Sequence, residues 1–250
     1  MNGFYLHDAE KIQNAETLQD VEKQMRILVN QYFHNAPFFT HLRQGLYNYE
    51  QIRYFAIQYF HYSKNFPRIL GAAISAMSPV DEWWIPLADN LWDEAGRGIA
   101  GRSHAELYKT FLFSVDPAVP LNEFGLPVNP PVSTAVTNAI DTFITFFRQA
   151  TPLQAMSAVG FGSEFFAGEV MGAIGQGLRH PNYTSSKPFD ITFWNVHADD
   201  HEPHHYQLCK NILDTFTDKE ELEEMLKTGV MIAKSEARMY NQLHKEMLEI

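Results

Sequence analysis

The sequence predicts an all-α protein, a bundle of seven to eight helices that forms a single domain over residues 1–250. Apolar residues recur at helical spacing through most of the chain, and capping residues precede many of these runs. We find no pair of alternating strand-like runs joined by a hairpin turn. Hydrophobic residues make up 45% of the chain, which is enough for one continuous core.

Three helical segments are expected in the first third of the chain. They cover approximately residues 16–33, 37–45 and 49–77. Asn48 is the expected capping residue of the third segment. Pro67 should kink this segment or restart it, because proline removes a backbone donor.

The middle of the chain alternates helices with breaks. A helix is expected after Pro79 and should end at the glycines that begin with Gly96, and another should start at Ser103. Five prolines and one glycine make residues 116–131 a loop, and a helix over residues 133–149 follows.

Three further helices complete the expected bundle. Thr151 and the proline after it begin a helix that reaches about residue 177. Asp190 precedes a histidine-rich helix, and the last helix opens at Thr217 and reaches almost to the C-terminus.

Composition excludes several kinds of partner. The net charge of −11 argues against a nucleic-acid or anionic-membrane surface. No apolar run approaches the ~20 residues that a membrane helix needs, and residues 1–14 do not resemble a signal peptide. The single cysteine, Cys209, points to a reducing compartment, so we expect a cytoplasmic protein. We expect Cys209 to be a small buried residue.

The stretch from residue 193 to 205 carries four of the eleven histidines. On a regular helix His197, His201 and His204 stand at i, i+4 and i+7, and therefore share one face. Converging imidazoles and carboxylates are typical of a transition-metal site. The alternative is a solvated, charged helix end without a role.

Two other segments offer ligands from facing helices. Glu94 follows an apolar run and His104 begins the next one. Glu164 has aromatic and small neighbours and is expected to be buried, either as a metal ligand or hydrogen-bonded to a tyrosine. A structural zinc site uses four ligands, usually with cysteine, and calcium or magnesium prefers oxygen. The mixed set instead favours a pair of iron or manganese ions held inside a bundle.

The order of these residues resembles the heme-oxygenase-like diiron oxidases, a family of iron-containing redox enzymes. This family includes the chlamydial protein associating with death domains (CADD). It shares its fold with thiaminase-II-like (TenA) proteins and pyrroloquinoline-quinone synthase (PqqC). The resemblance covers most of the chain and is strongest in residues 59–67, in residues 90–94 and around Glu164. It implies two iron ions, with manganese as an alternative in one position, dioxygen as co-substrate and Glu164 as the bridging carboxylate.

Two departures from the family pattern concern the ligands. Glu94 and His104 are ten residues apart rather than seven, and the glycines between them predict a break that restores the geometry. His201 stands where the family carries aspartate, and Asp200 is the alternative ligand. If neither residue is a ligand, the second metal ion is weakly bound or absent. His205 is assigned to the periphery of the site or the surface.

The resulting hypothesis is a nonheme diiron, or Fe/Mn, oxidase or oxygenase that acts on a small organic acid or an amino-acid-like molecule. Its pocket is expected at Tyr59, Phe60 and Phe55, although such an aromatic stripe is also typical of plain core. Lys64 and Arg68 are candidates for binding a substrate carboxylate, with surface solvation as the alternative.

Two other functions remain open. A metal-free hydrolase of the TenA type would need a cysteine nucleophile beside a buried carboxylate. A non-catalytic metal-binding or interaction protein would keep the fold and lose the reaction. We expect a small-molecule substrate, no nucleic acid and no membrane, and leave a homodimer open.

Overall fold

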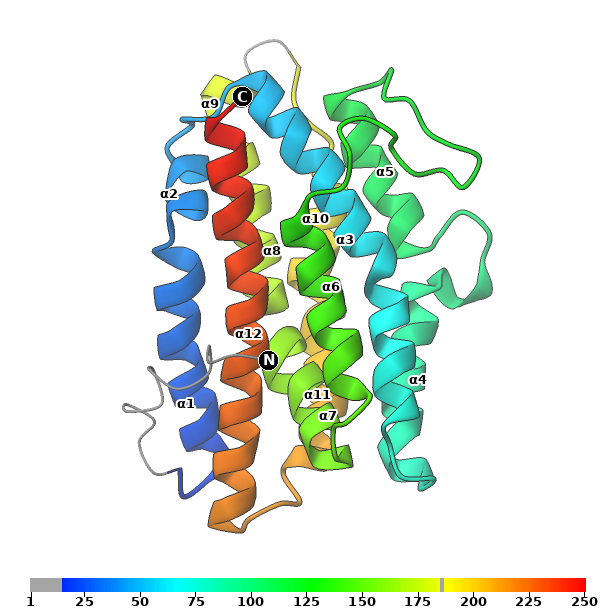
Figure 1. Ribbon diagram of the computed structural model, residues 1–250, viewed down its shortest axis with the longest axis vertical. Coiled ribbons are helices and arrows are strands. Elements are labelled where there is room, and N and C mark those ends of the chain that lie inside the picture. The colour runs from blue at the N-terminus through cyan, green and yellow to red at the C-terminus, as the bar shows by residue number, and fades with distance from the viewer. Residues whose placement is uncertain (1–14, 185–186) are drawn as a thin grey trace.

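The helices run largely along the long axis of the molecule, with α1 at one edge and α4 and α5 at the other (Figure 1). The computed structural model describes residues 15–184 and 187–250. The α-helices are α1 (Leu18–Val29), α2 (Pro37–Arg43), α3 (Tyr49–Ser75), α4 (Asp81–Glu94), α5 (His104–Val115), α6 (Thr134–Phe147), α7 (Pro152–Val159), α8 (Phe165–Leu178), α9 (Pro181–Thr184), α10 (Thr192–Val196), α11 (Glu202–Leu213) and α12 (Lys219–Leu248).

Three π-helical turns join some of these helices into continuous rods. They are η2 (Asn30–His34) after α1, η4 (Gly160–Glu164) between α7 and α8, and η5 (His197–His201) between α10 and α11. Counted as rods, the described residues form eight long helices plus the short α2 and α9. The prediction of an all-α bundle of seven to eight helices is therefore confirmed. Apart from one isolated bridge between Leu121 and Pro127, the described chain contains no β-structure.

The ends of the helices follow the local chemistry of the sequence. Asn48 caps α3 by accepting a hydrogen bond from the Gln51 amide, and Thr151 caps α7 in the same way. The expectation that Pro67 restarts the helix is wrong, because α3 continues through this residue. Buried residues on both sides, such as Tyr62 and Leu70, hold the rod together despite the missing backbone bond.

An aromatic core surrounds α12 and reaches the opposite wall of the bundle. Tyr240 of α12 packs against Phe38 and Phe39 of α2, with ring centroids 5.3 and 5.2 Å apart. Farther along, Tyr59 of α3 contacts Trp194 of α10 at 5.0 Å. All five rings are almost completely buried. Such packing ties together segments that are far apart in the sequence and determines which faces of the helices point inward.

The turn η4 lies directly against α12 because a glycine of each element faces a larger residue of the other. A Cβ atom placed on Gly162 would lie 2.6 Å from Cβ of Ile232. On the other side of the contact, a Cβ on Gly229 would lie 2.6 Å from Cβ of Phe161. This close approach buries the whole turn, including Glu164 at its end.

We expect Gly162→Ala to destabilise the protein by about 1–3 kcal/mol, because the new methyl group meets atoms that cannot move aside. The matched control is Gly71→Ala in α3, where no atom lies within 4 Å of the added Cβ. That change should be neutral or stabilise by up to about 1 kcal/mol. Urea unfolding of the two variants measures the difference, and equal stabilities would contradict the close contact.

None of the helices in the described ranges is both long enough and apolar enough to cross a bilayer.

Candidate metal centre

Three buried side chains from three segments converge in the bundle: Glu94 at the end of α4, His104 at the start of α5, and His197 at the start of η5. Oε1 of Glu94 lies 2.8 Å from Nδ1 of His104, and this nitrogen lies 3.0 Å from Nε2 of His197. One ligand atom of each residue falls within 4.8 Å of the other two. The three donors therefore surround a common point, and we call them the triad.

The chain reverses between Glu94 and His104 through a left-handed segment. Gly96, Arg97 and Gly98 have φ values of 67°, 51° and 73°. A Cβ on Gly96 would lie 2.3 Å from the carbonyl carbon of Arg102, so only glycine fits. This reversal brings His104 back beside Glu94 and confirms the break predicted from the glycines.

A backbone carbonyl orients His197 for metal binding. Nδ1 of its ring lies 2.7 Å from the carbonyl oxygen of Phe193, which can only accept a hydrogen bond. Nδ1 therefore carries the proton, and the lone pair of Nε2 is directed at the point on which the triad converges. The second hydrogen bond of a ligating histidine typically fixes its tautomer in this way.

A second buried group adjoins the triad and is built around Glu164. Nδ2 of Asn90 donates to Oε1 of Glu164 at 2.7 Å. On the other side, Nδ1 of His205 lies 3.7 Å from Oε2 of the same carboxylate. Nε2 of His205 faces Oδ2 of Asp93 at 3.3 Å, and Arg97 holds that aspartate through its other oxygen at 2.6 Å. His205 thus joins Glu164 to Asp93.

The π turn η5 changes which histidines face inward. A π turn adds one residue, which rotates the following side chains by about 100° relative to a regular helix. On a regular helix His204 would lie on the same face as His197. With the π turn, His205 lies on that face instead, and it is 1% exposed. The burial of His205 contradicts the expectation that it lies at the surface, and its place at the periphery of the site stays a prediction.

His204 does not join the triad. The side chain of His204 is 52% exposed, and its Nε2 lies 3.9 Å from a carboxylate oxygen of Asp89. The structure therefore does not bring His204 together with the other predicted ligands. The side chains of Asp200 and His201 lie outside the described residues.

A small cavity of about 30 Å³ opens beside the triad, enough for about two water molecules. Its aromatic wall is formed by Tyr59, Tyr62, Phe66 and Phe193. Its polar wall is formed by Ser63, Ser163, Glu94, His197 and Glu236.

Of the three residues expected to form the substrate pocket, Tyr59, Phe60 and Phe55, only Tyr59 lines this cavity. Phe55 lies one turn away from the cavity and packs against Phe38 and Trp194. Phe60 points to another face of α3 and contacts Tyr108. Both phenylalanines belong to the closed aromatic core, because only one stripe of α3 faces the cavity.

Glu236 is a buried acid that is not among the site residues predicted from the sequence. It is 6% exposed and lies in the middle of α12. Burial, and then the negative charge of Glu164, raise the pKa of Glu236 to about 8. A sequence signal was available, since Glu236 lies four residues from both Ile232 and Tyr240 on the apolar stripe of the last helix.

Cys209 lies in the core, as expected for a small buried residue. Burial raises the pKa of its thiol well above the usual range, and the charge of Glu164 adds to this effect. A reactive cysteine needs the opposite environment, which lowers the pKa.

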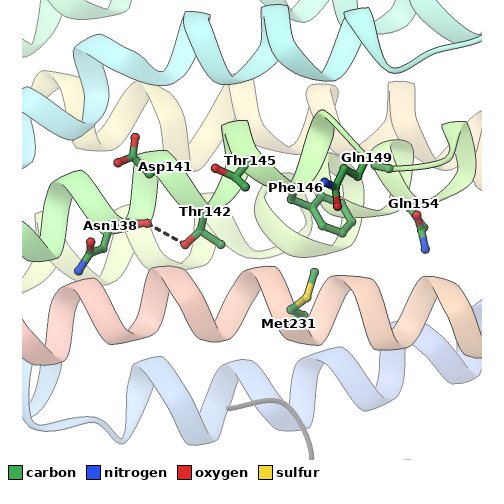
Figure 2. Close-up of a pocket in the computed structure, with 9 residues that line it drawn as sticks. Asn138, Asp141, Thr142, Thr145, Phe146, Gln149, Gln154 and Met231 are labelled. Atoms are coloured by element: carbon green, nitrogen blue, oxygen red, sulfur yellow. Dashed lines mark hydrogen bonds between the residues drawn. The ribbon is translucent and has the colours of Figure 1, made fainter. Parts of the chain in front are cut away.

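A polar surface groove lies between α6 and α12 (Figure 2), and no triad residue lines it. It has a volume of about 580 Å³. Thr142 extends from α6 towards α12, donating to the carbonyl oxygen of Asn138 at 2.7 Å, and Met231 extends from α12. Asp141 is the only titratable residue in its lining, so this groove lacks the ligands of a metal site.

Solved structures share this fold at low sequence identity. A CADD-like protein of unknown function from Nostoc punctiforme is 17% identical, with a TM-score of 0.72 over 91% of this chain and 97% of that chain. A domain of unknown function with a heme oxygenase-like fold from Shewanella denitrificans is 13% identical, with a TM-score of 0.68 over 93% and 92%. A TenA homologue from Pyrococcus furiosus is 11% identical, with a TM-score of 0.61 over 90% and 98%.

The sequence comparison is more specific than the fold. Among curated proteins, none matches the chain. The sequence model of a family described as iron-containing redox enzymes matches residues 53–236, which include the whole triad and the group around Glu164. With this match over more than half of its length, the chain belongs to the family of iron-containing redox enzymes.

Proposed function

We propose that this protein is a nonheme diiron enzyme that uses dioxygen to oxidise a small organic molecule. The triad carries this proposal, because its three buried donors converge on a common point. Two imidazoles and one carboxylate with open positions are the ligand set of nonheme ferrous oxygenases. Membership in a family of iron-containing redox enzymes supports the same metal.

The second ion would be held by Glu164 and His205. Asn90 orients Glu164 by donating to Oε1, which leaves Oε2 directed at His205. Asp93 accepts from Nε2 of His205, so that Nδ1 can bind metal. Glu164 is the proposed bridge between the ions. Manganese remains an alternative in one position, since carboxylate ligands also suit it.

Asp200 and His201 remain the predicted sources of one further ligand. Both belong to η5, which starts at the metal ligand His197. Counting bound iron in the variants Asp200→Ala and His201→Ala assigns this role to one of them, because only loss of a true ligand lowers the count.

Bound iron would supply the reduction of dioxygen and the oxidising power for the substrate. The protein's own residues hold the ligands, exclude water and orient the substrate. The rings of Phe66 and Phe193 keep one side of the cavity apolar. The hydroxyl of Tyr59 lies 3.3 Å from Sδ of Met171, which fixes another part of the wall.

Iron loading under anaerobic conditions tests the proposal. Protein prepared without oxygen, supplied with ferrous iron and freed of excess metal should retain about two ions per chain. Oxygen uptake should follow when air is admitted, and zinc-loaded protein should show none, because zinc has no redox chemistry. Iron near zero per chain would contradict the proposal, and bound iron without oxygen uptake would favour a non-catalytic protein.

A metal-free hydrolase of the TenA type is the alternative that the shared fold accommodates. The buried thiol of Cys209, with its raised pKa, weighs against this function. Hydrolysis by the iron-free protein that is lost in Cys209→Ser would support the hydrolase and contradict the oxidase.

A further inference from the structure

The cavity beside the triad lacks any positive charge among its described lining residues. Its titratable groups are the carboxyls of Glu94 and Glu236, the imidazole of His197 and two tyrosine hydroxyls. The three cations of α3 lie elsewhere: Arg53 pairs with Asp116 at 2.6 Å. Nζ of Lys64 lies 5.9 Å from the ring centre of Phe60, and Nη1 of Arg68 donates to Asn65 at 2.6 Å.

Two acids line the cavity, Glu94 and Glu236, and a metal ion bound to the triad would neutralise only Glu94. Glu94 belongs to the triad, whereas Glu236 comes from α12 and completes the cavity wall. No cation of the described chain lies close enough to lower its pKa, and the neighbouring hydroxyl of Tyr62 is the group that acts in that direction. A buried carboxyl without a positive partner is costly, so a ligand that supplies one is favoured.

Two buried tyrosine hydroxyls lie beside Glu236. The hydroxyl of Tyr62 lies close enough to Glu236, and that of Tyr240 to Tyr59, for each pair to interact, but neither oxygen makes a hydrogen bond of normal length and angle with a described residue. The hydroxyl of Tyr62 lowers the pKa of Glu236, and the charge of Glu236 raises the pKa of Tyr240. Both tyrosines therefore lie near Glu236. A buried hydroxyl usually has a partner, so this end of the cavity is prepared for one.

We propose that Glu236 and the hydroxyl of Tyr62 bind the amino group of a small primary amine, which makes amines the substrate class of the metal site. This inference rests on the proposed function. An ammonium group donates to the carboxylate and the phenol oxygen together, and the rings of Tyr59 and Phe66 favour a cation beside their faces. A carboxylate at the same place would face Glu236 without a cation to receive it.

The size of the cavity suits the amino end of such a molecule. About 30 Å³ holds about two non-hydrogen atoms, which are the amino nitrogen and the carbon that bears it. The triad residues Glu94 and His197 line the same space, so the carbon that bears the amino group would lie towards the metal site. Glu236 and Tyr62 are therefore residues that determine specificity rather than ligands of the metal.

Binding of small ions to the full chain, loaded anaerobically with ferrous iron, tests the proposal. Calorimetric titration with ethylammonium should show saturable binding, and titration with acetate at the same ionic strength should show none. Glu236→Gln keeps the shape of the side chain and should weaken ethylammonium binding at least about tenfold. Tyr62→Phe should weaken it about threefold. Glu249→Gln, at an exposed position after α12, is the charge-matched control and should bind as the wild type does.

Iron counted in the same samples separates this proposal from the proposed function. Two ions per chain with no ethylammonium binding, or with equal binding by Glu236→Gln, would overturn the amine assignment and leave the diiron site standing. Acetate binding in place of ethylammonium would also overturn it. If the protein retains no iron but still binds ethylammonium in a way that depends on Glu236, the amine assignment stands and the diiron site is contradicted.

Discussion

Replacing His197 with alanine should weaken binding of the first iron ion at least about 100-fold and abolish oxygen uptake. The triad has three protein donors, and loss of one leaves Glu94 and His104 alone around the metal. Even the loss of a group behind a ligand typically costs 10–100-fold in affinity, so loss of a ligand should cost more. Anaerobic iron titration followed by a count of retained metal measures the effect.

The control for this variant is His34→Ala. His34 lies in η2 and contacts Glu169 at 3.6 Å, so it belongs to none of the groups around the metal site. We expect its iron count and oxygen uptake to equal those of the wild type. A His197→Ala protein that is folded by circular dichroism and still binds iron tightly would reject the triad as a metal site.

Replacing His205 with alanine should remove the second ion, whereas replacing its neighbour His204 should not. His205 is buried between Asp93 and Glu164, and His204 is half exposed. The expected iron count therefore falls from about two to about one in His205→Ala, with loss of oxygen uptake, and remains unchanged in His204→Ala.

This pair of neighbours also tests the role of the π turn. If η5 sets the register, the effect must follow the buried residue. Asp93→Asn should weaken the second ion about 10–100-fold, because it alters the acceptor that orients His205. Loss of iron in His204→Ala with retention in His205→Ala would mean that a regular helix, and not the π turn, presents the ligands.

Much of the fold could be predicted because its signals are local. The caps at Asn48 and Thr151 follow from one side chain and the amide three residues later. The reversal after Glu94 follows from the glycines that begin with Gly96, since a left-handed backbone strongly favours this residue. For the same reason the pairing of Glu94 with His104 was accessible despite their unusual spacing.

The inward face of the histidine helix could not be predicted in this way. The rule of 3.6 residues per turn places His197 above His204, and one extra residue in η5 changes the partner to His205. A π turn has no distinctive residue pattern in this sequence. The register that it sets is seen only in contacts with distant parts of the chain, such as that of His205 with Asp93.

The sequence also could not predict which aromatic residues belong to the core and which line the cavity. Phe55, Tyr59 and Phe60 look alike in the sequence, and α3 directs only Tyr59 to the cavity. Glu236 is visible in the sequence as a single acid on an apolar stripe. Its raised pKa, however, depends on Glu164 and Tyr62, which belong to other helices of the bundle.

The sequence by itself determined the helical class, the positions of the helix ends, and the set of imidazoles and carboxylates from which a metal site is built. These properties depend on backbone propensity, capping and residue chemistry, which act over a few positions. The tertiary structure alone decided which of those side chains meet. Close approach of η4 to α12 through Gly162, and the rotation introduced by η5, bury Glu164 and His205 while leaving His204 in solvent. Packing selects the ligands, because a shift of one residue along a helix moves a side chain by about 100°.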